Sequence, residues 1–397
     1  MSKVSKSIKI VLLASILLLV FVVACTDQTG GGGGGCSSAA AQGWSGFSPY
    51  NKVLCFGSME GKVIAIDPQA RSDNMTFPAT GEWVYVIKTA TPGAGCGAMS
   101  MCSSSSSAAG AGIYDTPVVV DNLTYAGTYT GKVYAFNAIR GVVRWTYPRE
   151  GFDTVGAIVG DMVTDKQNLY FGSANTKVYA LDAASGDFLW EFQTSNKIWT
   201  APAVDKGVVY VGNYGGNVYA LSADSGKEIW NIKIPSAVAS SIVTDNDSIY
   251  FGTFDRSLYS ISKENGQEKW KYTAGNWFWA KPVLYNGKIY AACLDHNLYA
   301  LDENTGNLLW KFETESPIVG APAISGKYLY VVCDKGTLYK LDLDTGEKIS
   351  SMPIGFTVYG PPYVSGDMVY VYARDHNVYA VDTVKNTVVW KFSSFLK

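Results

Sequence analysis

The sequence is poor in histidine and in charge of either sign. Among 397 residues there are two histidines, and only 17% of the chain is Asp, Glu, Lys or Arg. Lys3, Lys6 and Lys9 stand in a leader that we expect to be removed, which leaves 29 basic against 34 acidic residues. The mature chain is then slightly acidic and has no basic stripe, so we expect no binding to nucleic acid.

The shortage of histidine also argues against most hydrolytic and metal chemistry. His296 and His376 fall at equivalent places, in Leu294-Asp-His-Asn297 and Arg374-Asp-His-Asn377. We interpret both as polar turn residues beside a capping aspartate, rather than as metal ligands or catalytic bases. Nucleophilic catalysis needs an oriented base, and metal hydrolases commonly need clustered His and carboxylate ligands. We therefore predict no catalytic residue and no metal site.

Long hydrophobic runs are absent except for one, from Ile10 to Ala24. Its fifteen residues, preceded by the lysines, are typical of a signal peptide and too few to span a bilayer. The run ends in Val22-Val23-Ala24-Cys25, which resembles the bacterial lipobox. We therefore predict a signal peptide over 1–24 and a lipid on Cys25; a cleaved signal with an incidental cysteine, or an uncleaved anchor, is the alternative.

Residues 25–43 contain a glycine run from Gly30 to Gly35 followed by Ser and Ala residues. This composition predicts a flexible tether. A phosphate-binding loop would need a strand before it and a helix after it, and neither is expected here.

No two cysteines are adjacent. Cys96 and Cys102 lie in one Gly/Ser/Ala-rich stretch, and a disulfide between them is as plausible as two free thiols. Cys293 and Cys333 occupy equivalent places in neighbouring repeats, roughly 10 Å apart and beyond disulfide reach. We expect these two to be buried thiols.

What the sequence does contain is a repeat of about 40 residues. One column is tryptophan, a second is tyrosine eleven residues earlier, and a third is glycine four residues before the tryptophan. The tryptophans are Trp145, Trp190, Trp230, Trp270, Trp310 and Trp390, with Ser350 in the missing register, and in a degenerate first copy Tyr85 is assigned to this column.

Each repeat contains four short alternating apolar segments separated by turn residues, without helical periodicity. Eight such units predict an all-β, eight-bladed β-propeller of four-stranded antiparallel blades over residues 44–397. Two insertions, about 68–80 and 91–112, are predicted to be surface loops.

The motif Ala-x-Asp-x-x-x-Gly-x-x-x-Trp is intact at Ala180 to Trp190 and Ala300 to Trp310. It resembles the tryptophan-docking motif of the pyrroloquinoline-quinone (PQQ) repeat family. The resemblance implies that the tryptophan column packs between adjacent blades. It implies the fold more strongly than the function, because members of this family range from alcohol dehydrogenases to noncatalytic scaffolds.

Within this family, the lipobox, the tether and a single ring are most similar to the BamB-like lipoproteins of the outer-membrane β-barrel assembly machinery. The catalytic relatives typically carry adjacent cysteines, calcium ligands and a catalytic aspartate. Because adjacent cysteines are absent, we predict a protein that is not an enzyme and has no cofactor. The alternative is a propeller that binds PQQ with calcium, or another small molecule, and is an oxidoreductase.

We expect the partner-binding face to be the one that carries the entries to the inner strands and the turns between second and third strands. Aromatic and arginine residues gather in these connections. The predicted set is Trp277, Phe278, Trp279, Trp199, Tyr359, Tyr114, Arg256 and Arg374. Trp199 and Trp279 could equally be plugs packed between blades, whereas Gly275-Asn-Trp-Phe-Trp-Ala280 places three aromatics in a row that cannot all face one way.

Together these features predict a monomeric, lipid-anchored, extracytoplasmic scaffold that binds one or more envelope proteins. The barrel-assembly machinery is the favoured partner. The lipid would hold the protein on the outer membrane facing the periplasm if the cell has an outer membrane, and otherwise on the cell surface.

Overall fold

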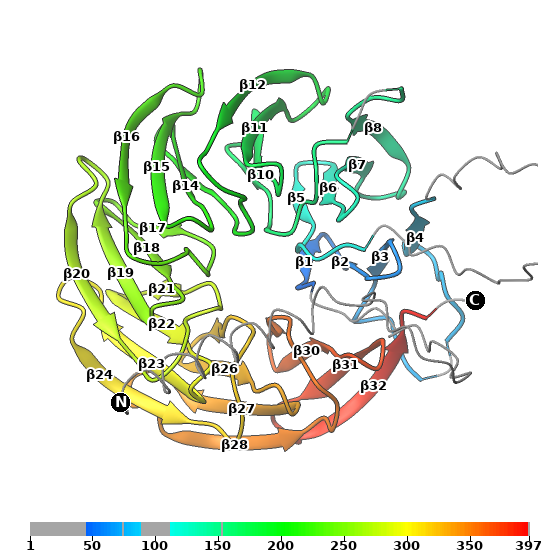
Figure 1. Ribbon diagram of the computed structural model, residues 1–397. Helices are drawn as coiled ribbons and strands as arrows, with labels where there is room; N and C mark the ends of the chain where they lie inside the picture. Colours follow the sequence, from blue (N-terminus) through cyan, green and yellow to red (C-terminus); the bar gives the residue numbers. More distant parts are fainter. Residues whose placement is uncertain (1–44, 74, 89–111, 152–153, 396–397) are drawn as a thin grey trace, which may run out of the picture. The chain divides into compact units, whose positions relative to one another are not determined.

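The computed structural model describes residues 45–73, 75–88, 112–151 and 154–395. The chain divides into two units, Met1–Ala40 and Ala41–Lys397, and the described residues all belong to the second. They form 32 strands and no helix, arranged in eight four-stranded antiparallel sheets around a ring (Figure 1). The predicted eight-bladed β-propeller is therefore confirmed, and no described segment forms a helix long and apolar enough to cross a membrane.

Each blade is built from four consecutive strands, from the innermost to the outermost. Blades 1 and 2 are β1 (Ser48–Tyr50), β2 (Val53–Gly57), β3 (Lys62–Ile66), β4 (Trp83–Val86) and β5 (Val118–Val120), β6 (Leu123–Gly127), β7 (Val133–Asn137), β8 (Val143–Tyr147). Blades 3 and 4 are β9 (Val163–Thr164), β10 (Asn168–Gly172), β11 (Lys177–Asp182), β12 (Phe188–Gln193) and β13 (Ala203–Asp205), β14 (Val208–Gly212), β15 (Asn217–Ser222), β16 (Glu228–Lys233). Blades 5 and 6 are β17 (Val243–Thr244), β18 (Ser248–Gly252), β19 (Ser257–Ser262), β20 (Glu268–Thr273) and β21 (Val283–Tyr285), β22 (Lys288–Ala292), β23 (Asn297–Asp302), β24 (Leu308–Glu313). Blades 7 and 8 are β25 (Ala323–Ser325), β26 (Tyr328–Val332), β27 (Thr337–Asp342), β28 (Lys348–Pro353) and β29 (Tyr363–Ser365), β30 (Met368–Tyr372), β31 (Asn377–Asp382), β32 (Thr387–Ser393).

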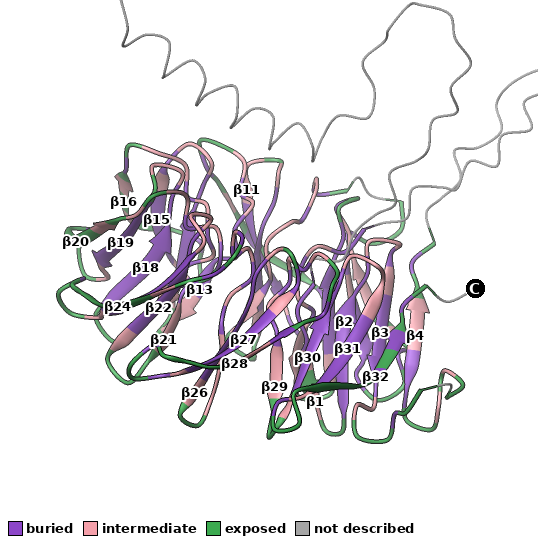
Figure 2. Ribbon diagram, turned by 90° about the horizontal axis from the view of Figure 1, so that it is seen from below, coloured by how far each residue is buried: buried purple, intermediate pink, exposed green. Residues whose placement is uncertain are grey.

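The middle strands of each blade are buried on both faces because a neighbouring sheet covers each side. In blade 3, β10 and β11 are buried almost throughout, whereas β12 alternates between buried and exposed residues. Figure 2 shows the same pattern of burial around the ring. The core is therefore a series of layers between adjacent sheets, and each layer depends on the spacing of two blades.

The tryptophan column fixes that spacing. The indole Nε1 of Trp190 donates a hydrogen bond of 2.8 Å to the carbonyl of Ala223, in the β15–β16 turn of the next blade. In the same turn Gly226 has φ +68, and a Cβ there would lie 2.6 Å from the Trp190 ring. Only glycine combines this backbone conformation with such close approach. Trp145, Trp230 and Trp270 make the corresponding bonds to the blades that follow them.

The first blade corrects one detail of the repeat alignment. Trp83, not Tyr85, occupies the tryptophan register, because Trp83 pairs with Ala65 as Trp190 pairs with Ala180. The Trp83 indole donates to the carbonyl of Ala138 at 2.9 Å. Counting from Gly81 was misleading because Gly81 lies two residues before Trp83, whereas Gly186 lies four residues before Trp190.

The ring closes between blades 8 and 1 without a strand exchanged between them, since each sheet contains only consecutive strands. The connection between β3 and β4 reaches across this junction. Its Arg71 forms a buried ion pair with Glu82, with Nη2 and Oε2 2.5 Å apart, and the guanidinium lies 4.3 Å from the ring centroid of Phe392 on β32. Phe77 packs on the same ring, and Asp73 accepts a hydrogen bond from the backbone of Lys391. We call this connection the closing clasp.

Replacing Trp190 by alanine should destabilise the propeller by about 3–5 kcal/mol, because it removes a buried aromatic and leaves a cavity. Leu189→Ala is the matched control, since Leu189 is 44% exposed on the same strand. Chemical denaturation followed by tryptophan fluorescence and circular dichroism measures both. Equal, small losses in the two variants would show that the column does not hold the blades together.

Arg71→Met should cost about 3–5 kcal/mol, because it leaves the Glu82 carboxylate buried without its cation. The control is Arg149→Met, which breaks the exposed ion pair with Asp187 and should cost less than about 1 kcal/mol. Thermal and denaturant unfolding compare the two. A stability loss no greater for Arg71→Met than for Arg149→Met would contradict the role of the clasp.

Candidate functional site

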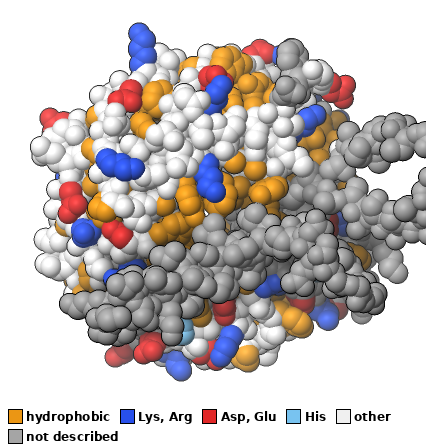
Figure 3. All heavy atoms as spheres, viewed as in Figure 1, with side chains coloured by type: hydrophobic (Ala, Val, Ile, Leu, Met, Phe, Trp, Pro, Cys, Tyr) orange, Lys and Arg blue, Asp and Glu red, His pale blue; other side chains and the backbone are white. Residues whose placement is uncertain are grey.

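Two sets of loops lie together on one face of the ring, as the blade topology requires. In blade 4, the backbone of Tyr214, in the β14–β15 turn, donates to the carbonyl of Lys197, in the connection that enters β13, at 2.9 Å. In blade 6, Leu294 donates in the same way to Trp277 at 3.0 Å. Figure 3 looks onto this face, where hydrophobic side chains gather toward the middle.

Aromatic side chains from blades 4, 5 and 6 form a continuous series of contacts on this face. We call this series the aromatic row; its members are Trp199, Tyr214, Phe254, Trp277 and Trp279. The ring centroids are 5.2 Å apart for Trp199 and Tyr214, 5.5 Å for Tyr214 and Phe254, 4.7 Å for Phe254 and Trp277, and 5.7 Å for Phe254 and Trp279. All five side chains are half-buried, so one part of each ring packs on its neighbours and another part remains in contact with solvent.

A lysine lies at one end of the row. Lys197 Nζ is 3.8 Å from the ring centroid of Trp199 and 4.6 Å from that of Tyr214. Burial against these rings lowers the pKa of Lys197. The ammonium group of Lys197 and the rings of Trp199 and Tyr214 attract one another, and this attraction holds the two aromatic side chains in place.

The indole nitrogen of Trp199 is buried and has no hydrogen-bond partner among the described residues. A buried, unpaired donor costs free energy. Trp199 is therefore the member of the row whose present surroundings satisfy it least.

Phe278 does not belong to the exposed face, and its inclusion in the predicted set was wrong. It is 0% exposed and lies in the layer between blades 5 and 6, 5.8 Å from the ring of Tyr299. A Cβ on Gly252 would lie 2.2 Å from the Phe278 carbonyl, so the connection runs directly against β18. Phe278 points into the ring, while Trp277 and Trp279 on either side of it reach the surface row.

The other predicted residues of this face lie in different blades. Tyr114 of blade 2 packs on Tyr129 with ring centroids 5.3 Å apart. In blade 8, Arg374 donates to the hydroxyl of Tyr359 at 2.9 Å. Arg256 is exposed in the β18–β19 turn with φ +69. The aromatic row is thus the part of the predicted face in which side chains from several blades come together.

The repeat analysis did not identify a pair of carboxylates at the start of two inner strands. Asp115 accepts a hydrogen bond from Gly127 N at 2.9 Å, and Asp161 accepts one from Thr116 N at 2.8 Å. Burial raises the pKa of Asp115 well above its ordinary value; the bond from Gly127 opposes this shift and the nearby charge of Asp161 adds to it. Burial also raises the pKa of Asp161, while Thr116 and Lys281 lower it.

Other blades satisfy the same backbone group with an uncharged side chain. Ser45 and Ser240 accept from Gly57 and Gly252, as Asp115 accepts from Gly127. Asp115 therefore has a structural explanation, but its second oxygen, Oδ1, is buried without a partner among the described residues. Asp115 and Asp161 stand in two columns of the repeat that are otherwise occupied by small residues, Thr, Lys and Pro. These two departures were the signal in the sequence that could have identified the carboxylates.

The remaining candidate residues divide into those described and those outside the described ranges. Cys293 and Cys333 are buried free thiols, as expected, and His296 and His376 are turn residues with φ +73 and +64. Cys25, Cys96 and Cys102 lie outside the described residues. Within the described ranges, no three His, Cys, Asp or Glu side chains are grouped so that they could hold a metal ion.

Two family models match the chain. The model described as "Beta-alanine-activating enzyme, beta-propeller" matches residues 158–395, and the model described as "Outer membrane protein assembly factor BamB" matches residues 22–198. Outer membrane protein assembly factor BamB of Salmonella typhimurium is 31% identical over 93 residues, which are 22% of this chain and 24% of that protein. BamB of Legionella pneumophila is 31% identical over 90 residues, 22% of this chain and 21% of that protein. The match thus spans about a quarter or less of the length of these curated relatives.

Solved structures show the same fold. BamB from Moraxella catarrhalis superposes with a TM-score of 0.62 at 16% identity, covering 70% of this chain and 87% of that one. The computationally designed protein Ika8 superposes with a TM-score of 0.68 at 16% identity, covering 86% and 97%. Fold, repeat and matches together define a β-propeller of the PQQ-repeat class. The chain belongs to the β-propeller family whose model matches residues 158–395, and it is BamB-like.

The buried carboxyl group of Asp115 predicts how the free energy of unfolding changes with pH. The unfolded Asp115 carboxyl titrates near its ordinary value of 3.8, and the folded one titrates above it. As the pH rises from about 4, the unfolded chain binds fewer protons than the folded one, so this group makes the free energy of unfolding decrease. Asp115→Asn should therefore become more stable relative to the unmutated protein as the pH rises, as measured by denaturant unfolding at several pH values.

Asp302→Asn is the control with the opposite sign. Hydrogen bonds from Thr305 lower the pKa of Asp302, so its charged form contributes stability that is lost as the pH falls. The Asp302→Asn protein should become less stable relative to the unmutated protein as the pH rises. A stability difference for Asp115→Asn that does not change with pH would mean that this carboxyl is not perturbed.

Proposed function

We propose that this protein is a noncatalytic, lipid-anchored propeller in the cell envelope, and that it uses the aromatic row to bind a partner protein in outer-membrane protein assembly. The observation that supports this most is the row itself. Five half-buried aromatic rings from three blades are in mutual contact, and aromatic residues are enriched where protein interfaces concentrate their binding energy.

The blades also hold the row in position before any partner arrives. The turns and connections that carry these rings are joined by backbone hydrogen bonds, from Tyr214 to Lys197, from Phe254 to Ala237 and from Leu294 to Trp277. Preorganised side chains lose little conformational freedom on binding, which favours affinity. The names of the BamB relatives support assembly of outer-membrane proteins as the process.

Anchoring is the second element of the proposal. A signal core that ends in Val22-Val23-Ala24-Cys25 supports lipidation of Cys25, and residues 26–43 would then link the lipid to the propeller. Such a link would place the aromatic row within reach of envelope proteins near the membrane.

A second function is favoured by one observation, the buried and unpartnered Oδ1 of Asp115 near Asp161. It would be the binding of a small polar molecule at the inner strands. Calcium takes six to eight oxygen ligands, and among the described residues no third His, Cys, Asp or Glu side chain is grouped with the two aspartates, which does not favour the calcium-bound quinone of the catalytic relatives. We therefore propose no oxidation step for this chain.

Trp277→Ala should reduce capture of the partner at least about fivefold, because truncating an aromatic anchor commonly costs more than about 1 kcal/mol of binding energy. The measurement is quantitative mass spectrometry of proteins that co-purify with the tagged protein from solubilised membranes. Leu309→Ala is the control, since Leu309 is 48% exposed on β24, the outer strand of the same blade. Unchanged recovery of outer-membrane assembly proteins with Trp277→Ala would contradict the proposal.

A further inference from the structure

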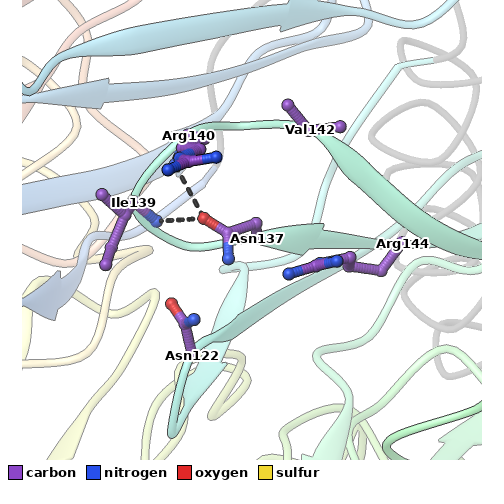
Figure 4. Close-up of a pocket in the computed structure, with 6 residues that line it drawn as sticks. All are labelled: Asn122, Asn137, Ile139, Arg140, Val142 and Arg144. Atoms are coloured by element: carbon purple, nitrogen blue, oxygen red, sulfur yellow. Dashed lines mark hydrogen bonds between the residues drawn. The ribbon is translucent and has the colours of Figure 1, made fainter.

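Blade 2 has a pocket on the face opposite to the aromatic row. It measures about 400 Å³ and is lined by Asn122, Asn137, Ile139, Arg140, Val142 and Arg144 (Figure 4). These residues belong to the β5–β6 turn, the end of β7, the β7–β8 turn and the start of β8. Turns that precede and follow the same strand lie at opposite ends of an antiparallel blade, so this pocket and the aromatic row do not share a face. We call it the arginine pocket.

The turn that forms the pocket differs from its counterparts in charge. In blades 3 to 8, the eight residues that begin at Asp182, Ser222, Ser262, Asp302, Asp342 and Asp382 each include at least one Asp or Glu. The corresponding residues of blade 2, 137–144, read Asn-Ala-Ile-Arg-Gly-Val-Val-Arg and include none. Blade 2 therefore presents two positive charges and no acidic group in a turn where blades 3 to 8 each present at least one acidic group.

Asn137 shows how the turn keeps its shape without a carboxylate. Its Oδ1 accepts hydrogen bonds from the backbone of Ile139 at 3.1 Å and Arg140 at 3.0 Å. Asp302 does the same for Asn304 and Thr305 at 3.1 and 2.8 Å. The amide thus replaces the carboxylate as a turn acceptor, removes its charge and adds a donor, and Figure 4 shows the amide nitrogen turned toward Asn122.

The two arginines are available for a ligand. Both are exposed, and within the described part of the chain neither guanidinium has a carboxylate at ion-pair distance. Arg149, further along the same blade, shows the contrast, because it is paired with Asp187. The pocket itself is lined by guanidinium and amide donors and by no acidic side chain.

Apolar surface accompanies these donors. Ile139 and Val142 are 54% and 58% exposed at the pocket. A bare inorganic anion would leave these side chains uncovered, whereas a peptide places an aliphatic side chain beside its carboxylate. Since guanidinium groups bind carboxylates through paired, charge-assisted hydrogen bonds, the combination matches an acidic peptide segment that also carries aliphatic residues.

We propose that the arginine pocket is a second docking site of this propeller, and that it binds an acidic, aliphatic segment of a partner protein. Arg140 and Arg144 bind the carboxylates, and Ile139 and Val142 contact the aliphatic side chains. This site is independent of the aromatic row, so one propeller joins two protein segments from opposite faces.

The test uses two fluorescein-labelled peptides that differ only in charge, Gly-Leu-Asp-Glu-Leu-Gly and Gly-Leu-Asn-Gln-Leu-Gly. Fluorescence anisotropy at low ionic strength measures their binding to the full chain and to the Arg140→Gln/Arg144→Gln variant. We expect the acidic peptide to bind at least about tenfold more tightly than its amide counterpart, and added salt to weaken it. The double variant should lose this preference.

Two controls separate the pocket from general charge and from folding. Arg149→Gln removes an exposed arginine outside the pocket and should bind the acidic peptide as the unmutated protein does. Thermal melting should show that the double variant is folded. Equal binding of the two peptides, or full binding by the double variant, would overturn the proposal. So would binding of vesicles containing phosphatidylglycerol through these arginines without binding of the acidic peptide.

Discussion

The docking of a tryptophan against the glycine turn of the next blade, which occurs at six junctions of the ring, is the constraint on which the structure depends. Sheets packed face to face can slide or splay, and apolar side chains alone do not fix their angle. The indole of Trp190 meets Gly226 and donates to Ala223, so packing and hydrogen bonding select the same position. The same packing of tryptophan on glycine recurs at each junction from blades 1 and 2 to blades 6 and 7, and it sets the spacing of these blades. At the junction of blades 8 and 1, the closing clasp adds a buried ion pair and an aromatic contact.

The ring holds different kinds of side chain on its two faces. Connections on one face carry the aromatic row, whose members come from three blades and meet only because the blades are held at a fixed angle. The opposite face carries the arginine pocket, which is built within a single blade. The second and third strands of each blade, such as β10 and β11, are almost entirely buried, and substitutions there would act on stability. The surface loops are therefore where binding can change without loss of the fold.

The sequence predicted the fold because the residues that position the blades recur at fixed spacing. Contacts between blades were harder to predict. The three consecutive aromatic residues in the segment from Gly275 to Ala280 indicated that they could not all face one way. Only the layer between blades 5 and 6 shows that Phe278 is the buried one. Tyr85 was assigned to the tryptophan column in place of Trp83, because Gly81 stands two residues before Trp83, whereas Gly186 stands four residues before Trp190. Asp115 and Asp161 depart from the other residues of their repeat columns, but their proximity to one another could not be predicted, since it depends on how two inner strands meet.

The central claim is that the aromatic row is a protein-binding surface in the cell envelope. The most direct measurement is photocrosslinking in native membranes from a photoreactive amino acid placed at position 277, followed by mass spectrometry of the captured species. We predict capture of a protein of the outer-membrane assembly machinery from this position. Repeated failure to capture any protein, with the propeller folded and present in the membrane fraction, would contradict the account.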